Sequence, residues 1–313
     1  MMNLKPDFEL APIVLFVYNR VDTLELTINA LKHNVWAEQS ILYVFSDFCK
    51  FDRDKDAVLQ VREFIRKISG FKEIFITEAA ENLGLAKSII NGVTLVISQY
   101  EKAIVLEDDL ISSRNFLVYM NKALVYYEQE SKIFSIAGYS PTMTDRKNND
   151  VYLTRRASSW GWATWADRWQ EVDWEVQDYP AFRADKVKRK QFNEMGSDLC
   201  GMLDKQMMGK LNSWAIRWVY AQFIKDLYSV YPTVSKIENV GTAQAATNTR
   251  DSANRFKTVL DKSDRLSFDF IPADQIDPVF IKHFIKQYSI RTRIKYKILN
   301  AFAFWRSLMM PKS

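Results

Sequence analysis

The chain has 313 residues, of which 48% are hydrophobic and 26% are charged. This composition is that of a folded globular protein, and it excludes a disordered chain, a collagen-like chain and a disulfide-rich scaffold. The formal net charge is +5, yet Asp277 is the last acidic residue and eight of the 43 cationic residues follow it. Residues 1–277 are therefore slightly acidic. This distribution argues against nucleic-acid binding over the whole surface and leaves the basic tail to contact an anionic surface.

The few cysteines and the short apolar runs restrict the cellular setting. Cys49 and Cys200 cannot supply a disulfide framework, and two histidines leave little for a His/Cys zinc site. The apolar stretch over residues 11–18 ends at Asn19 and Arg20, which is too short for a membrane span or a typical signal peptide. We expect a cytoplasmic protein that is at most peripheral on the inner face of a membrane.

The first half of the chain alternates short apolar runs with amphipathic stretches. The apolar runs predict strands over residues 13–17, 41–45, 73–77, 103–106 and 132–137. The amphipathic stretches predict helices over residues 23–32, 55–69, 87–100 and 115–130. This order is typical of an α/β fold with a mostly parallel sheet flanked by helices, in which ligands bind beyond the carboxyl ends of the strands.

The regular alternation stops near Pro141. Five of the nine tryptophans lie within residues 160–174, and those at 162, 165 and 169 repeat at helical spacing, which predicts a largely buried helix. Helical patterns follow over 186–209 and 212–228, and then a loop over 235–254. We divide the chain into an α/β unit (1–140), a smaller unit over the sheet edge (141–277) and a basic amphipathic tail (278–313).

The sharpest motif is VLEDDL, which places Glu107, Asp108 and Asp109 at the end of a predicted buried strand. Adjacent carboxylates repel each other and are costly to bury, and a divalent cation relieves both penalties. Oxygen ligands suit Mg²⁺ or Mn²⁺, so the motif predicts a metal site. The alternative is a structural turn or helix start.

Other polar residues follow the predicted strands at the same edge. Asn19 and Arg20 precede a helix and suit an anionic ligand or a ribose, or else the helix is simply capped by Asp22. Asp47 can accept hydrogen bonds from a base edge or merely end its strand. Lys87 in NLGLAKS can reach a diphosphate, although helix-start punctuation explains its glycine equally well. No Walker loop and no GxGxxG motif occurs.

The block SSWGWATWADRW offers a surface for a sugar. Trp160 and Trp162 flank Gly161, and an aromatic wall with close access to the backbone suits the apolar face of a sugar ring. The alternative is that these tryptophans belong to the core.

In this order, the motifs resemble nucleotide-sugar glycosyltransferases of the GT-A fold, in particular bacterial relatives of the N-acetylglucosaminyltransferase I family. The similarity rests on PIVLFVYNRVDTLELTINAL, FSDFC, NLGLAKSI, VLEDDL, SWGW, SWAIRW and YPTVSKIENVG, between residues 12 and 241. It implies that Asp109 binds Mn²⁺ or Mg²⁺ and that Glu107 and Asp108 contact the donor sugar and ribose. It also implies that Arg20 and Asp47 hold the ribose and uracil of a UDP-sugar.

The resemblance implies an inverting enzyme, which needs a carboxylate base for the acceptor hydroxyl. Eukaryotic members carry paired aspartates where this chain reads Ile216 and Arg217 before Trp218. Asp204 is our candidate base, with Asp198 and Glu194 as further candidates, and the alternative is that each solvates a helix. No histidine follows Gly241 as an extra metal ligand, so we expect weak metal binding without donor.

The resemblance predicts transfer of a sugar from a UDP-sugar to a saccharide acceptor, which can be lipid-linked, in bacterial surface polysaccharide or glycan synthesis. Golgi members have an N-terminal membrane anchor that this sequence lacks, which favours a bacterial cytoplasmic setting. A sugar-phosphate nucleotidyltransferase and an inactive saccharide-binding or membrane-associated scaffold are the alternatives. The tail predicts either a helix lying on an anionic membrane or a docked C-terminal helix.

Overall fold

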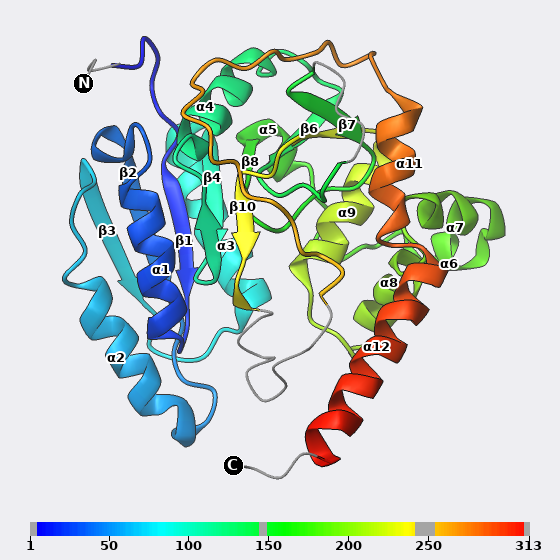
Figure 1. Ribbon diagram of the computed structural model, residues 1–313, viewed down its shortest axis with the longest axis horizontal. Coiled ribbons are helices and arrows are strands. Elements are labelled where there is room, and N and C mark those ends of the chain that lie inside the picture. Colours follow the sequence, from blue (N-terminus) through cyan, green and yellow to red (C-terminus); the bar gives the residue numbers. More distant parts are fainter. Residues whose placement is uncertain (1–4, 144–148, 242–253, 310–313) are drawn as a thin grey trace.

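A computed structural model describes residues 5–143, 149–241 and 254–309, without the side chains of residues 303–309. Within them, eight strands form one sheet in the order β3-β2-β1-β4-β8-β6-β9-β7 (Figure 1). All of these strands run parallel to β1 except β7 and β8, which are antiparallel to their neighbours. Their bounds are β1 (Ile13–Val17), β2 (Ile41–Ser46), β3 (Glu73–Glu78), β4 (Lys102–Glu107), β6 (Ile133–Ala137), β7 (Val151–Thr154), β8 (Trp162–Trp165) and β9 (Tyr228–Pro232).

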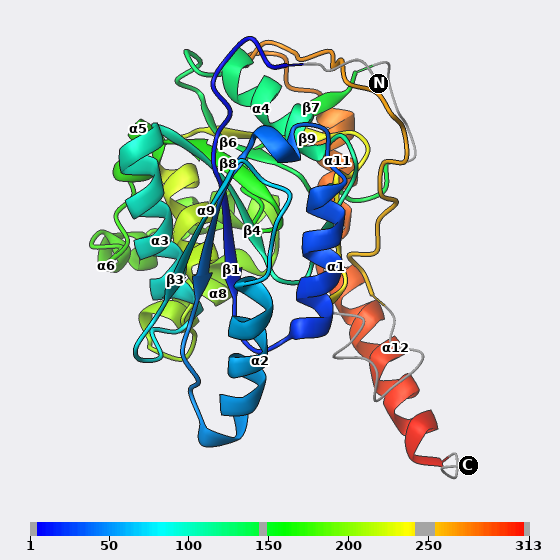
Figure 2. The same cartoon turned by 90° about the vertical axis from the view of Figure 1, so that its left-hand side faces the viewer.

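Helices cover both faces of the sheet (Figures 1 and 2). The central strand β1 is buried throughout, because Ile13, Leu15 and Val17 pack on one face while Val14 and Phe16 pack on the other. The first face is covered by α1 (Val21–Lys32), α2 (Lys55–Ile65) and α4 (Phe116–Tyr126). The second face is covered by α3 (Leu85–Tyr100), α5 (Ala166–Gln170) and α9 (Trp214–Ile224).

The elements expected in the first half are confirmed, and the expected α/β class holds. Each of the five strands expected there begins and ends within one residue of the observed strand, and the helices differ by at most four residues at one end. The expectation for residues 162–165 is wrong, because they form β8 and only residues 166–170 form a helix. All four β8 side chains are buried, so no alternation of apolar and polar residues reveals the strand.

The sheet is continuous across residue 140. β8 lies between β4 and β6, so a strand from beyond residue 140 separates two strands from before it. The predicted helical stretch 186–209 is interrupted and forms α7 (Lys186–Phe192) and α8 (Leu199–Met207). A Cβ at Gly196, between them, would lie 2.1 Å from Nη1 of Arg156, so the break leaves room for the ion pair of Arg156 with Asp198.

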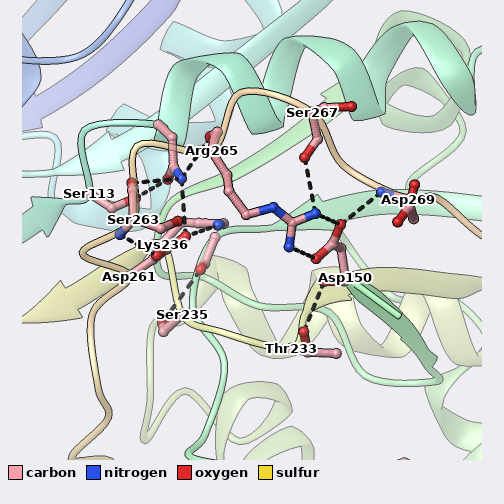
Figure 3. Close-up of polar contacts among 12 residues, drawn as sticks. Ser113, Asp150, Thr233, Ser235, Lys236, Asp261, Ser263, Arg265, Ser267 and Asp269 are labelled. Atoms are coloured by element: carbon pink, nitrogen blue, oxygen red, sulfur yellow. Dashed lines mark hydrogen bonds and ion pairs between the residues drawn. The ribbon is translucent and has the colours of Figure 1, made fainter. Parts of the chain in front are cut away.

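The segment over residues 254–277 crosses the body as an extended strap that polar contacts hold in place (Figure 3). Lys236 forms a buried ion pair with Asp261 of the strap. Arg265 makes two hydrogen bonds of 2.7 Å to Asp150, whose carboxylate also accepts the backbone N–H of Asp269 at 2.8 Å. These contacts line a cavity of about 370 Å³, in which the charges of Asp150, Lys236, Asp261 and Arg265 are already paired.

The tail consists of α11 (Pro278–Lys286) and α12 (Ile290–Met309). α11 packs on the body through Phe280 and Phe284, and α12 extends away from the body (Figure 2). The side chain of Arg306 and residue Lys312, both counted in the basic tail, lie outside the described parts. No helix among the described residues is long and apolar enough to cross a membrane.

Candidate functional site

A cavity of about 490 Å³ opens at the carboxyl ends of β1, β2 and β4. Because these strands are parallel, the residues that follow them meet at one edge of the sheet. Five of the six residues predicted to bind a donor line this cavity: Asn19, Arg20, Asp47, Glu107 and Asp108. The sixth, Lys87, is exposed on the first turn of α3 and is absent from the lining.

Arg20 holds two of the three consecutive carboxylates. Its Nη2 lies 2.5 Å from Oδ1 of Asp108 and 3.1 Å from Oδ2 of Asp109. The backbone N–H of Tyr18 donates to the other oxygen of Asp108 at 3.2 Å. Asp108 thus joins the end of β1 to the turn after β4. Glu107 also lines the cavity, but it forms no ion pair with Arg20.

Burial and mutual repulsion raise the pKa values of two carboxyl groups in the acidic motif. Burial, with the charges of Asp109 and Asp108, raises the pKa of Glu107 to about 8. Burial also raises the pKa of Asp108 to about 6, although the adjacent Arg20 opposes the shift. The single guanidinium of Arg20 therefore does not neutralise the three carboxylates. The negative charge that is left at this edge of the sheet favours binding of a further cation.

The side chains at this edge can hold a divalent cation only if a bound ligand supplies part of its coordination. The described residues contain no group of three or more His, Cys, Asp or Glu side chains arranged to hold a metal. Asp109 offers a hard carboxylate whose side chain is only 14% exposed, and Asn239 donates to its Oδ1 at 3.4 Å. A Mg²⁺ or Mn²⁺ held by Asp109 would need further oxygen ligands from water and from an anionic substrate.

Gly241 packs directly against the carboxylate of Asp109. The antiparallel pair β5 (Leu110–Ser112) and β10 (Ile237–Asn239) brings this segment to the site, and the N–H of Val240 donates to the carbonyl oxygen of Asp109 at 2.9 Å. A Cβ added at Gly241 would lie 2.0 Å from Oδ2 of Asp109 and 2.8 Å from Nη1 of Arg20. A side chain at this position would therefore displace the Asp109 carboxylate and the end of the Arg20 side chain.

Asp47 fastens the loop that begins α3. Its carboxylate accepts the backbone N–H groups of Leu83 and Gly84, each at 2.8 Å, and that of Phe48 at 2.9 Å. The side-chain amide of Asn82 donates to it at 3.1 Å. Since these four bonds use the acceptor positions of a carboxylate, the contacts favour a role in positioning the loop over direct contact with a base.

Several residues that line the first cavity were not predicted individually from the sequence. Lys50, Ser88 and Asn212 complete the wall of the cavity, together with Tyr18 and Asn82. The hydroxyl of Ser88 is buried and has no hydrogen-bond partner among the described residues. Tyr18 was within reach of sequence reasoning, since it directly follows a strand, whereas Lys50 and Asn212 come from loops whose position only the tertiary fold sets.

A second cavity, of about 150 Å³, contains one of the predicted sugar-binding residues. Trp160 lines it, together with Tyr139, Phe256 and Trp218. The indole N–H of Trp218 is buried and has no partner within the described parts of the chain. Ala215 and Ile216, in the first turn of α9, also line this cavity, and Asn212 of the first cavity lies only three residues before Ala215, so the loop before α9 reaches the first cavity and the start of α9 reaches the second.

Gly161 and Trp162 lie elsewhere than expected. Trp162 is 1% exposed and stacks with Trp169, Trp214 and Trp218 at ring-centroid distances of 5.1–5.7 Å, so its face is closed to a sugar. Gly161 lies beneath Ile237, whose Cγ1 would be 2.6 Å from an added Cβ, and its carbonyl oxygen accepts the N–H of Gly138. The expected aromatic wall is reduced to Trp160, because the other two positions belong to the core.

The three candidate bases are paired or exposed. Asp204 makes two hydrogen bonds to Arg189, at 2.9 and 2.8 Å, and accepts one from Tyr179 at 3.0 Å. The bonds from Arg189 hold the pKa of Asp204 below its usual value, which weakens it as a base, and neither cavity is lined by it. Asp198 is paired with Arg156 at 2.9 Å, and Glu194 is exposed.

No family model matches this chain, and no curated protein matches it. Among solved structures, S. aureus TarS is similar at a TM-score of 0.30 and 15% identity, over 44% of this chain and only 23% of that chain. The mannosyltransferase PcManGT from Pyrobaculum calidifontis, in complex with GDP-Man and Mn²⁺, is similar at 0.32 and 12%, over 52% and 49%. A UDP-glucose pyrophosphorylase complexed with UDP-glucose gives 0.37 and 12%, over 75% and 95%. Similarity at this level identifies neither a substrate nor a reaction.

Proposed function

We propose that the protein is a glycosyltransferase that moves a sugar from a UDP-sugar to a saccharide acceptor, a step in bacterial surface polysaccharide or glycan synthesis. The observation that carries this proposal is the cavity at the ends of β1, β2 and β4, with Arg20 and three consecutive carboxylates in or beside it. A volume of about 490 Å³ is in the range of small-molecule sites.

Different residues of the first cavity contact different parts of the UDP-sugar in this proposal. Glu107, Asp108 and Asn19 offer hydrogen bonds to the hydroxyl groups of the ribose and the sugar. Arg20 and Lys50 supply positive charge for the diphosphate. Asp47 holds the loop over residues 82–84 in place, and thereby presents Ser88 and the start of α3 to the donor. Lys87 lies beyond this wall and reaches the donor only if its side chain turns inward.

Asp109, together with the donor's phosphate oxygens, is proposed to hold Mn²⁺ or Mg²⁺. When bound, such a cation neutralises the negative charge that develops on the leaving diphosphate. Gly241 keeps the space beside the Asp109 carboxylate free of a side chain.

The second cavity is proposed to receive the acceptor saccharide. Trp160 offers an aromatic face to the apolar side of a sugar ring. The segment over residues 212–216, which includes the first turn of α9, borders both cavities, so donor and acceptor would lie side by side. We propose an inverting transfer but assign no base, because Asp204 is held by Arg189 and Tyr179.

The test incubates the protein with a panel of nucleotide sugars and Mn²⁺ and follows release of nucleoside diphosphate. Asp109→Asn should lower turnover by about 100-fold or more, while the exposed control Glu81→Gln should not change it. If no nucleotide sugar binds or is consumed, the proposal is wrong. Formation of UTP from a UDP-sugar and diphosphate would instead identify a nucleotidyltransferase, and saccharide binding without donor turnover would identify an inactive scaffold.

We propose that the reaction takes place in the cytoplasm, because two cysteines far apart in the sequence favour a reducing compartment. A lipid-linked acceptor is the form to test first among the saccharides, since such acceptors are assembled at a membrane surface.

A further inference from the structure

We propose that α12 binds the surface of an anionic lipid membrane. No described residue of α12 lines either cavity of the proposed active site, so the inference does not rest on the proposed reaction. It rests on how the tail is anchored, on what its helix exposes, and on the sign of its charge.

The root of the tail is fixed to the body. Phe280 stacks on Tyr152 with ring centroids 5.1 Å apart, and Phe284 meets Tyr231 edge-on at 5.0 Å. Arg293, in the first turn of α12, donates to the hydroxyl of Ser197 at 3.0 Å. The helix therefore leaves the body from an anchored position rather than from a loose terminus.

Beyond this contact the helix is not docked. All six residues from Lys297 to Phe302 are exposed. Since an α-helix completes a turn in about 3.6 residues, six consecutive exposed residues mean that no face of this segment is covered. The alternative of a docked C-terminal helix therefore does not hold for residues 297–302.

The exposed surface carries large apolar side chains at four-residue intervals. Ile290, Ile294, Ile298 and Phe302 are 62%, 53%, 50% and 69% exposed. Residues four apart lie on neighbouring rows of a helix, so these side chains form a continuous apolar stripe along α12. Exposed apolar stripes of this kind mark a surface that another molecule covers.

Basic side chains border this stripe, and no acidic residue accompanies them. Arg291, Lys295 and Lys297 are exposed on the same helix, and no Asp or Glu occurs after Asp277. A second copy of α12 packed on the stripe would bring like charges together. A bilayer with anionic headgroups matches both features, because the stripe enters the acyl boundary while the long basic side chains reach the headgroups.

The experiment is flotation of the full chain with vesicles of phosphatidylcholine, either alone or with about one third phosphatidylglycerol. We expect binding to the anionic vesicles and little to the neutral ones. Combining Arg291→Glu, Lys295→Glu and Lys297→Glu should weaken partitioning by roughly 100-fold. The matched control reverses three exposed lysines of α7, at 186, 188 and 190, and should stay within about twofold of the parent.

A second pair of variants tests the apolar stripe. Ile294→Asn with Ile298→Asn should weaken binding by about tenfold or more, whereas Leu26→Asn with Leu59→Asn, on equally exposed positions of α1 and α2, should not. The proposal is overturned if the parent chain does not float with anionic vesicles, or if the α7 control loses as much binding as the α12 variant. It is equally overturned if the stripe variant abolishes a dimer in solution while lipid binding is absent. Turnover of soluble donor is measured alongside, so that failure of the reaction and failure of the membrane proposal are told apart.

Discussion

Asp47 is the residue on which the α3 side of the first cavity depends. Three of its four hydrogen bonds join the end of β2 to the loop over residues 82–84, and the fourth comes from the N–H of Phe48. Asp47→Asn places an N–H₂ group against N–H donors, so we expect a loss of about 1–3 kcal/mol in the free energy of unfolding. We also expect about tenfold weaker binding of a UDP-sugar.

Denaturant unfolding and calorimetric titration measure the two effects. Glu81→Gln serves as the control, since it makes the same change of charge at an exposed position beside the loop. Unchanged donor affinity in Asp47→Asn would separate this loop from the donor site.

Gly241 gives a test of the Asp109 site that leaves every carboxylate in place. In Gly241→Ala the new Cβ collides with the Asp109 carboxylate, 2.0 Å away, so this side chain and Arg20 must move. We expect turnover with Mn²⁺ to fall by about tenfold or more, with a smaller effect on stability. Steady-state kinetics over a range of Mn²⁺ concentrations measures the change.

The matched control is Gly201→Ala. An added Cβ there has no heavy atom within 4 Å, and the position lies inside α8, so the variant should gain about 0.5–1 kcal/mol of stability with normal turnover. Equal turnover in the two alanine variants would contradict the role given to the Asp109 carboxylate.

At the scale of elements, one buried ion pair fixes the strap over residues 254–277. Lys236 and Asp261 are 6% and 9% exposed, and Asn115 donates a further hydrogen bond to Asp261 at 3.0 Å. Asp261→Asn leaves a buried ammonium without its counter-charge, so we expect a loss of about 3–5 kcal/mol in denaturant unfolding. Asp264→Asn removes an exposed ion pair with Arg114 in the same strap and should cost less than about 1 kcal/mol.

The same pair predicts how stability depends on pH. Burial alone would raise the pKa of Asp261, but hydrogen bonds from Lys236 and Asn115 lower it to about 2, from 3.8. The unfolded chain therefore binds this proton first, and the contribution of Asp261 is present above about pH 4 and is lost as the pH falls toward 2. Unfolding free energies of the parent and of Asp261→Asn should thus converge over this range. A difference that stays constant down to pH 2 would refute the assignment.

Over the whole molecule, sequence reasoning succeeded where local patterns and tertiary structure agree. The parallel half of the sheet has apolar strands followed by polar residues, and parallel strands necessarily bring Arg20, Asp47 and Glu107 to one edge. It failed at Trp162, because a strand buried on both faces shows no alternation. Asn212 and Trp218 reach the cavities through packing of α9 against the sheet, which no local spacing records.

The tail illustrates the same limit. Its charge and apolar content predicted an amphipathic helix, but the choice between a docked and a free helix depends on contacts with distant residues. Phe280 is 1% exposed and anchors α11, whereas Phe302 lies uncovered on α12. The same residue type thus has opposite surroundings within one tail, which only the folded structure distinguishes.

The positions of the tryptophans predict that the two cavities differ in their effect on intrinsic fluorescence. Trp162 packs against Trp169, Trp214 and Trp218, of which Trp218 lines the second cavity, while no described tryptophan lines the first. Intrinsic tryptophan fluorescence should therefore stay nearly constant when a UDP-sugar binds and change when a saccharide reaches Trp160, and Trp160→Phe should remove most of that change. The protein would then report its two substrates by separate signals in one unlabelled sample.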